Sequence, residues 1–72
     1  MHCIGLGCNV RQVRRARRMT QAELAAAVLV SRQTIISIEG GDYAPSVLLA
    51  LRIAAALDST VDALFFITPE ES

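Results

Sequence analysis

The sequence predicts an all-α domain of five short helices, and three observations carry that prediction. At 72 residues the chain has the length of one small domain, and 53% of its residues are hydrophobic, mostly Ala, Leu, Val and Ile. Apolar residues recur at helical spacing in short segments, several of which begin with Ser, Thr or Asn, the residue types that cap helix N-termini. In residues 20–39 two such segments follow each other with a three-residue break between them.

The N-terminal part divides into an arm and a first helix. Residues 1–8, MHCIGLGC, contain two glycines and show no periodicity, which predicts an irregular N-terminal arm. Asn9 is placed to cap a helix that runs to about Arg17. Val10 and Val13 lie on its inward face, and the stem of Arg17 is expected to lie over apolar neighbours.

The arm raises the question of a metal or thiol site. His2, Cys3 and Cys8 include a C-x4-C spacing, but no second cysteine pair follows. Structural zinc sites usually draw four ligands from recognisable pairs, and a reducing cytosol disfavours a stable disulfide. The favoured alternatives are a flexible tail or apolar cover for the first helix.

The second and third helices carry clear start signals. Thr20 and Glu23 fit a capping box, and Met19 and Leu24 occupy the hydrophobic staple positions around it. Ser31 is placed to cap the next helix in the same way. The side chains expected to face the core are those of Leu24, Ala25, Val28, Ile35 and Ile38, with the small Ala25 at the helix crossing.

The C-terminal half predicts two further helices. Ser46 is placed to cap a helix from Val47 to Leu57, whose apolar residues cover more than one face. Ser59 and Asp62 fit a capping box for a helix over roughly residues 60–66. Residues 68–72 are polar and acidic and are expected to fray as a flexible tail.

The outward face of the third helix has the residue types that read DNA. Arg32, Gln33, Ile36 and Ser37 remain outward once the inward positions are assigned. Arginine matches guanine and glutamine matches adenine in the major groove, and Arg32 and Gln33 stand at the N-terminal end that enters first. Ser37 is a candidate for a base edge or a phosphate. Ile36 has two open interpretations, contact with a thymine methyl group or an exposed residue without a role.

These segments together resemble the lambda-repressor-like (Cro/C1, Xre family) helix-turn-helix transcriptional regulators. The resemblance rests on TQAELA, VSRQTI, IEGGDYAPS and ALRIAAAL, which occur in the family's order and separations. It implies a lambda-repressor-like DNA-binding domain over residues 9–67, with double-stranded DNA as partner. It also implies a dimer that occupies a short near-palindromic operator.

Two site assignments come from the resemblance. In the family an Arg at the position of Arg14 often pairs with the Glu that ends the recognition helix, here Glu39. Such a buried pair would cost roughly 3–5 kcal/mol if one partner were removed, because the other charge is left without compensation. The family uses a Gln at the position of Gln21 for the DNA backbone or a nearby base, at a helix start that favours phosphate. The alternative for Gln21 is an ordinary polar residue in the first helical turn.

The sequence also departs from the family. Arg18, Leu29 and Asp58 stand where the family commonly has Gly in a left-handed conformation at a helix end. Arg18 and Leu29 tolerate that conformation poorly, at a cost on the order of 1 kcal/mol each, unless the turn geometry differs. Asp42 replaces a basic residue that is frequent in the family, so the loop after the third helix is expected to stand further from phosphate or to use Tyr43 and backbone amides.

The distribution of charge supports a DNA partner although the net charge is zero. Residues 1–36 hold six Arg and one Glu, whereas residues 37–72 hold one Arg and six acidic residues. DNA affinity follows the local potential at the contact face. Arg11, Arg15 and Arg18 are therefore candidates for phosphate contacts, and solvated helix faces are the alternative.

The apolar run Leu64, Phe65, Phe66 and Ile67 predicts a subunit interface. One helix face cannot bury four consecutive apolar side chains, so some of them must be exposed or meet another chain. We expect a two-fold homodimer that uses this end and places its recognition helices one DNA turn apart.

The remaining observations exclude other classes of function. The sequence contains no Ser/His/Asp or Cys/His constellation, no phosphate-binding loop and no set of metal ligands, so we expect neither an enzyme nor a cofactor. The longest apolar run, residues 24–30, is far too short to span a membrane, and no signal peptide is visible, which predicts a cytoplasmic protein. Two alternatives stay open: an antitoxin or restriction-modification controller that also binds a protein, and an interaction module that has lost DNA binding.

Overall fold

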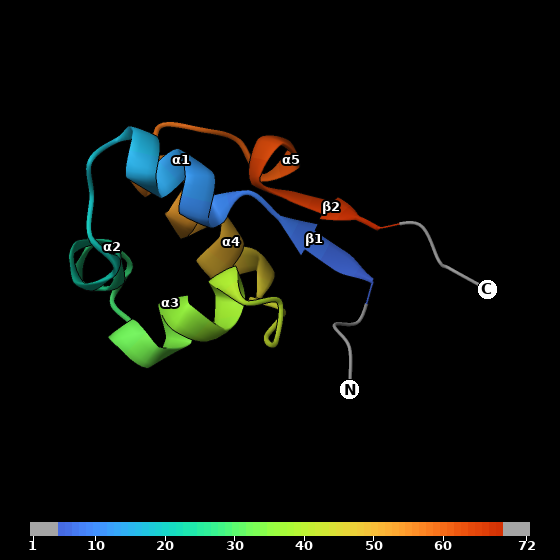
Figure 1. The fold of residues 1–72 in the computed structure, drawn as a ribbon, viewed down its shortest axis with the longest axis horizontal. Coiled ribbons are helices and arrows are strands. Elements are labelled where there is room, and N and C mark those ends of the chain that lie inside the picture. The colour runs from blue at the N-terminus through green and yellow to red at the C-terminus, as the bar shows by residue number, and fades with distance from the viewer. Residues whose placement is uncertain (1–4, 69–72) are drawn as a thin grey trace.

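The computed structural model describes residues 5–68, which form five helices and one small sheet (Figure 1). The elements in chain order are β1 (Leu6–Cys8), α1 (Val10–Ala16), α2 (Gln21–Val28), α3 (Arg32–Glu39), α4 (Val47–Ala56), α5 (Val61–Leu64) and β2 (Phe65–Ile67). The predicted five-helix class is confirmed, and the sheet is an addition to it. His2, Cys3 and most of the predicted tail, residues 69–72, lie outside the described residues.

Side-chain caps begin the central helices as their sequences predict. The Thr20 Oγ1 atom accepts a hydrogen bond from the Glu23 N–H at 3.0 Å, and the Glu23 carboxylate accepts one from the Thr20 N–H at 2.8 Å. Ser31 caps α3 and Ser46 caps α4, each by accepting from the backbone N–H three residues later. These bonds satisfy amides that have no partner within the helix, so they fix where each helix begins.

The core lies where α2, α3 and α4 meet beneath α1. The five side chains predicted to face inward are buried, and Ala25 is 4% exposed at the α2–α3 crossing. The fully buried side chains come from α1, α2, α3, α4, its C-cap and α5, namely Val10, Leu24, Ile35, Ile53, Leu57 and Leu64. Small and branched apolar residues therefore fill one contiguous core, to which α3 contributes the side chains of its inner face.

Three residues that follow helices, none of them glycine, adopt the left-handed conformation. Arg18, Leu29 and Asp58 have φ angles of 58°, 64° and 52°. The chain thus keeps the usual turn geometry and places unfavourable residue types in it, instead of changing the turn.

The C-terminal end differs from the prediction. Thr60 caps α5, since its Oγ1 atom accepts from the Ala63 N–H at 3.2 Å, and Ser59 does not. The helix ends at Leu64, and Phe65–Ile67 form β2 in place of the predicted last helical turn. Aromatic and β-branched residues favour a strand when a partner is available, and β1 supplies that partner.

The N-terminal arm is in part a strand. Leu6–Cys8 pair with β2 in antiparallel register, and Gly7 lies opposite Phe66. The prediction of an irregular segment is wrong for these residues, because their pairing partner is about sixty residues away and leaves no local pattern. The sheet lies next to α5, at the end of the molecule opposite α2 (Figure 1).

Two polar side chains connect α1 to the C-terminal half. Asn9 begins α1 without a side-chain cap, and its Nδ2 atom instead donates to the Ala63 carbonyl at 3.1 Å. Arg17 stays exposed, contrary to the predicted inward stem, and its Nε atom donates to the Leu57 carbonyl at 2.7 Å. Both residues satisfy carbonyls of α4 and α5 that have no helical partner.

Candidate nucleic-acid interface

The first turn of α3 presents two long polar side chains to solvent. Arg32 and Gln33 are both exposed, directly after the Ser31 cap. Their neighbours one turn on, Ile36 and Ser37, are half-buried, so they offer less surface than the sequence suggests. The N-terminal turn is therefore the part of α3 that is most available to a base edge.

A depression of about 240 Å³ lies between α3 and the loop that follows it. Its lining consists of Ser31, Gln33, Thr34, Ser37, Asp42 and Tyr43. Tyr43 is 46% exposed, and the exposed Asp42 is held through its N–H, which donates to the Ser37 carbonyl at 2.9 Å. Hydroxyl, amide and carboxylate groups thus share one face with Gln33, and Asp42 brings a negative charge to it.

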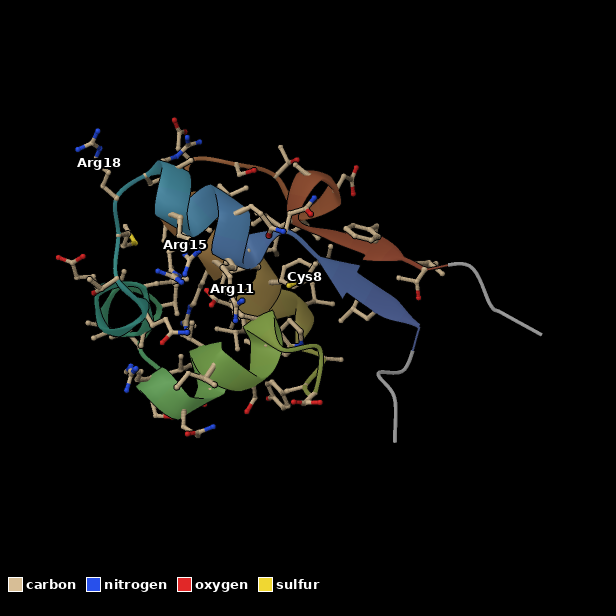
Figure 2. All side chains as sticks on the ribbon, viewed as in Figure 1. Cys8, Arg11, Arg15 and Arg18 are labelled. Atoms are coloured by element: carbon tan, nitrogen blue, oxygen red, sulfur yellow. The ribbon has the colours of Figure 1, made fainter. Side chains whose placement is uncertain are left out.

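The arginines of the N-terminal half do not form one cluster. Arg11, Arg15 and Arg18 are all exposed. Figure 2 shows Arg11 and Arg15 on α1, whereas Arg18 lies beyond the helix in the connection to α2 and well apart from α3. Of the three candidates for phosphate contacts, Arg11 and Arg15 thus belong to one helix and Arg18 does not.

The ion pair between Arg14 and Glu39 is present and almost completely buried. The Arg14 Nε atom donates to Glu39 Oε2 at 2.6 Å and its Nη2 atom to Oε1 at 3.3 Å. The two side chains are 9% and 0% exposed. The Arg14 Nη1 atom also donates to the Met19 carbonyl at 2.8 Å, so one guanidinium links α1, the α1–α2 connection and α3.

Two further cationic or polar groups reach the same carboxylate. The Gln21 Nε2 atom donates to Glu39 Oε1 at 3.1 Å, and the Arg11 Nε atom lies 3.6 Å from it. Burial alone would raise the pKa of Glu39. The hydrogen bonds from Arg14 and Gln21, with the charges of Arg14 and Arg11, outweigh that effect and lower the pKa below its ordinary value.

Gln21 therefore has a partner that sequence reasoning did not find. Its side chain is directed to Glu39, eighteen residues away, and is half-buried. Neither the phosphate contact nor the ordinary polar position considered for Gln21 includes this bond. A spacing of eighteen residues between two helices has no local periodicity that would reveal it.

The predicted interface residues divide into core and surface. Leu64 is fully buried within the subunit, so it cannot be part of an exposed interface, and Phe65 is half-buried against the core. Phe66 and Ile67 are 44% and 89% exposed. The prediction that Leu64 belongs to the interface is wrong, because Leu64 ends α5 and its side chain is part of the core.

Exposed apolar side chains of α4 lie next to β2. Val47, Leu48 and Leu51 of α4 are each more than half exposed. A groove of about 310 Å³ runs between α4, the preceding loop and the sheet, lined by Leu6, Ala44, Pro45, Val47, Ala50, Leu51, Val61 and Phe65. We call this groove with Leu48 and Ile67 the apolar surface; Phe66 lies on the other face of the sheet, over Gly7. The signal of the apolar surface in the sequence is the excess of apolar residues in residues 47–57.

Cys8 fits the role of apolar cover. Its thiol is half-buried against the core and lies 3.5 Å from the Ile38 carbonyl, to which it donates. Burial raises the pKa of this thiol, and the charge of Glu39 adds to that effect while the Val10 N–H and Arg11 oppose it. Within residues 5–68 no three His, Cys, Asp or Glu side chains come together as metal ligands. None of the helices in that range combines the length and apolar content that a membrane crossing requires.

Comparisons with known proteins agree on one family. The helix-turn-helix family model matches residues 10–64. An uncharacterized HTH-type transcriptional regulator of Methanothermobacter thermautotrophicus is 54% identical over 48 residues, which cover 67% of this chain and 70% of that protein. The uncharacterized HTH-type transcriptional regulator YgzD of Bacillus subtilis is 39% identical over 62 residues, which cover 86% of this chain and 94% of that protein.

Two solved structures share the fold. The clp gene regulator ClgR of Corynebacterium glutamicum superposes with a TM-score of 0.70 and 31% identity over 72% of this chain, which corresponds to 55% of that longer chain. The restriction-modification controller protein C.AhdI of Aeromonas hydrophila gives a TM-score of 0.69 and 29% identity, and the match covers 72% of this chain and 79% of that chain. With the exposed first turn of α3 and the capped α2–α3 corner, these matches show that the chain belongs to the Cro/C1-type helix-turn-helix family of DNA-binding transcriptional regulators.

Proposed function

We propose that the protein is a sequence-specific transcriptional regulator that binds a short near-palindromic operator in the cytoplasm as a homodimer. The observation that carries this proposal is the exposure of Arg32 and Gln33, side by side at the start of a helix whose other face is locked into the core. A recognition helix needs exposed polar side chains on a rigid support, and α3 has both.

Affinity and choice of sequence come from different groups in this proposal. Arg11, Arg15 and Arg18, with Gln21 and Tyr43, contact phosphate and contribute affinity for any duplex. Arg32 and Gln33 contact base edges, and Ile36 and Ser37 contribute with the part of their surface that remains exposed. Arg18 is the least favoured of the phosphate contacts because it lies well apart from α3 (Figure 2).

The homodimer in this proposal uses the apolar surface. A small monomer rarely leaves a contiguous apolar patch of this kind in water, and a second copy would cover Val47, Leu51 and Ile67. The interface therefore consists of the predicted Phe65 and Ile67, without Leu64 and Phe66, together with α4. The surface is separate from the first turn of α3, so dimerisation leaves both reading helices free.

The test is selection of a binding site from random duplexes, followed by a mobility shift with purified variants. Arg32→Ala or Gln33→Ala is expected to relax preference at one half-site position, at a cost of roughly 1–3 kcal/mol. Arg15→Ala is expected to weaken binding to all DNA sequences alike. The affinity of this variant is also expected to depend less steeply on salt concentration. Arg52→Ala, on the exposed side of α4, is the matched control and is expected to bind as the parent does. Selection that yields no preferred duplex would contradict the proposal.

One comparison favours a more specific role as a second candidate. The structural neighbour C.AhdI is a restriction-modification controller protein of nearly the same fold. Controllers of that kind bind DNA, so the selection experiment alone does not separate the two roles. Genes for a restriction enzyme and a methyltransferase beside the coding sequence would support the controller role. An antitoxin would likewise bind DNA and in addition a protein partner. A chain that selects no DNA but retains a protein partner would instead be an interaction module of this fold.

A further inference from the structure

The buried carboxylate of Glu39 uses its two oxygens differently. Oε2 accepts the short bond from Arg14 Nε at 2.6 Å. Oε1 accepts from Gln21 Nε2 at 3.1 Å, faces Arg11 Nε at 3.6 Å and receives a longer bond from Arg14 Nη2 at 3.3 Å. One side of the carboxylate thus holds the scaffold, and the other side meets two residues that extend toward the surface.

Arg14 differs from Arg11 and Gln21 in whether it has N–H groups that are not already bound within the protein. Arg14 is 9% exposed in its side chain and is occupied by Glu39 and the Met19 carbonyl. The side chain of Arg11 is 53% exposed, and its ion pair uses Nε, which leaves both terminal nitrogens of the guanidinium outside that contact. Gln21 is half-buried, and its primary amide has a second N–H beyond the one that Glu39 accepts.

We propose that Glu39 is a positioning residue for DNA binding, which holds Gln21 and Arg11 so that their remaining N–H groups donate to phosphates beside the groove that α3 enters. This inference rests on the proposed function. A donor that is already ordered loses less conformational entropy on binding than a free one. Because Glu39 is also the last residue of α3, the same carboxylate fixes these donors relative to the reading helix.

The replacement Glu39→Gln tests the positioning role separately from the buried contact between Glu39 and Arg14. A glutamine at this position can direct its oxygen to Arg14 and keep the strongest hydrogen bond. Its NH₂ group then faces Arg11, which is a donor only and loses its acceptor. It also faces Gln21, whose amide must turn over to accept from it, so the Gln21 NH₂ group is no longer held. The scaffold contact is retained in part while both N–H groups that Glu39 held are released.

The experiment measures operator affinity by fluorescence anisotropy for Gln21→Ala and Arg11→Ala, each with Glu39 and with Glu39→Gln. With Glu39, Gln21→Ala is expected to weaken binding at least about tenfold for all sequences, the value of one hydrogen bond to a charged group, without a change in salt dependence. Arg11→Ala is expected to reduce the slope of log affinity against log salt by about 0.9. With Glu39→Gln, Gln21→Ala is expected to weaken binding less than about twofold and Arg11→Ala to change the salt slope less than it does with Glu39, because the donors are no longer held.

Matched controls use the same residue types elsewhere. Gln12→Ala removes an exposed amide of α1, and Arg52→Ala removes an exposed arginine of α4, and neither is expected to change affinity. If Gln21→Ala and Arg11→Ala have no effect, or have the same effect with Glu39→Gln, the inference is overturned. A parent protein that selects no duplex overturns the proposed function instead.

A second measurement covers the case in which Glu39→Gln does not fold. In the parent protein, the Gln21 side-chain amide has two distinct proton resonances, and the one held by Glu39 is expected to exchange slowly with solvent. On addition of the selected operator, the other proton is expected to shift as it meets phosphate. An amide that exchanges rapidly in the free protein, or is unchanged by DNA, overturns the inference.

Discussion

Leu29 combines two unfavourable conditions in one residue. Its backbone is left-handed, at a φ of 64°, and its side chain is 78% exposed. The first condition strains a residue with a Cβ atom, and the second leaves an isobutyl group in water. Among the described residues, Leu29 is not one of the apolar side chains packed against the core, so it is a site where the fold can be improved.

Leu29→Gly is expected to raise the free energy of unfolding by about 1 kcal/mol, because glycine adopts this conformation without strain. Leu29→Asn is expected to give a smaller gain, since asparagine tolerates the left-handed region better than leucine. Thermal unfolding followed by circular dichroism measures both. A loss of stability in both variants would show that Leu29 makes a stabilising contact.

Glu39 makes the stability of the fold depend on pH in the acid range. Its folded pKa lies below the unfolded value of about 4.5, so its contribution is fully present above that pH and is lost as the pH falls through the folded pKa. The stability difference between the parent and Glu39→Gln is therefore expected to be constant from neutral pH to about 5 and to narrow below it. Denaturant unfolding across this range measures the difference. A gap that stays constant down to the acid limit of folding would contradict the lowered pKa.

At the scale of elements, the β1–β2 pair depends on one glycine. A Cβ atom at Gly7 would lie 2.0 Å from the Phe66 ring, which rests over the glycine in the opposite strand. The ring thus covers backbone that a side chain would otherwise cover, a cross-strand arrangement that favours glycine at this position.

Gly7→Ala is expected to displace the ring and to lower stability by roughly 1–3 kcal/mol, as overpacking does elsewhere. In a Phe66→Ala background the same change is expected to be neutral or slightly favourable, because the space is then free. A double-mutant cycle of unfolding free energies measures this coupling. Equal effects of Gly7→Ala in both backgrounds would show that the ring does not occupy this space.

The elements differ in how far the sequence predicts them. The starts of α2, α3 and α4 follow from Thr20, Ser31 and Ser46, because a cap and its partner lie three residues apart. The segment at residues 65–67 was expected to continue a helix, because its partner strand lies far away in the sequence. The same distance hides the bond from Gln21 to Glu39, whereas Arg32 and Gln33 follow directly from helical periodicity.

At the scale of the molecule, the two halves of the chain carry opposite charge, and the apolar surface lies on α4 and β2 in the acidic half. Residues 1–36 have a net charge of +5 and residues 37–72 of −5. The arginines proposed to contact DNA and most of the surface proposed for dimerisation are thus drawn from different parts of the chain. Substitution of these arginines is expected to leave dimerisation intact.

Leu51→Ser and Ile67→Ser are each expected to convert a dimer into a folded monomer, because each places a hydroxyl in the apolar surface. Light scattering at micromolar concentration should report twice the chain mass of 7.8 kDa for the parent and the single mass for the variants. Leu29→Ser, at an exposed leucine outside the surface, is the control. A monodisperse parent monomer would remove the homodimer from the proposed function.

The antiparallel pairing of Leu6–Cys8 with Phe65–Ile67 also closes a loop of about sixty residues. The entropy cost of closing that loop falls once the helices between the two strands have packed. The sheet is therefore expected to form after α1 to α4 have packed, and to open before them on unfolding.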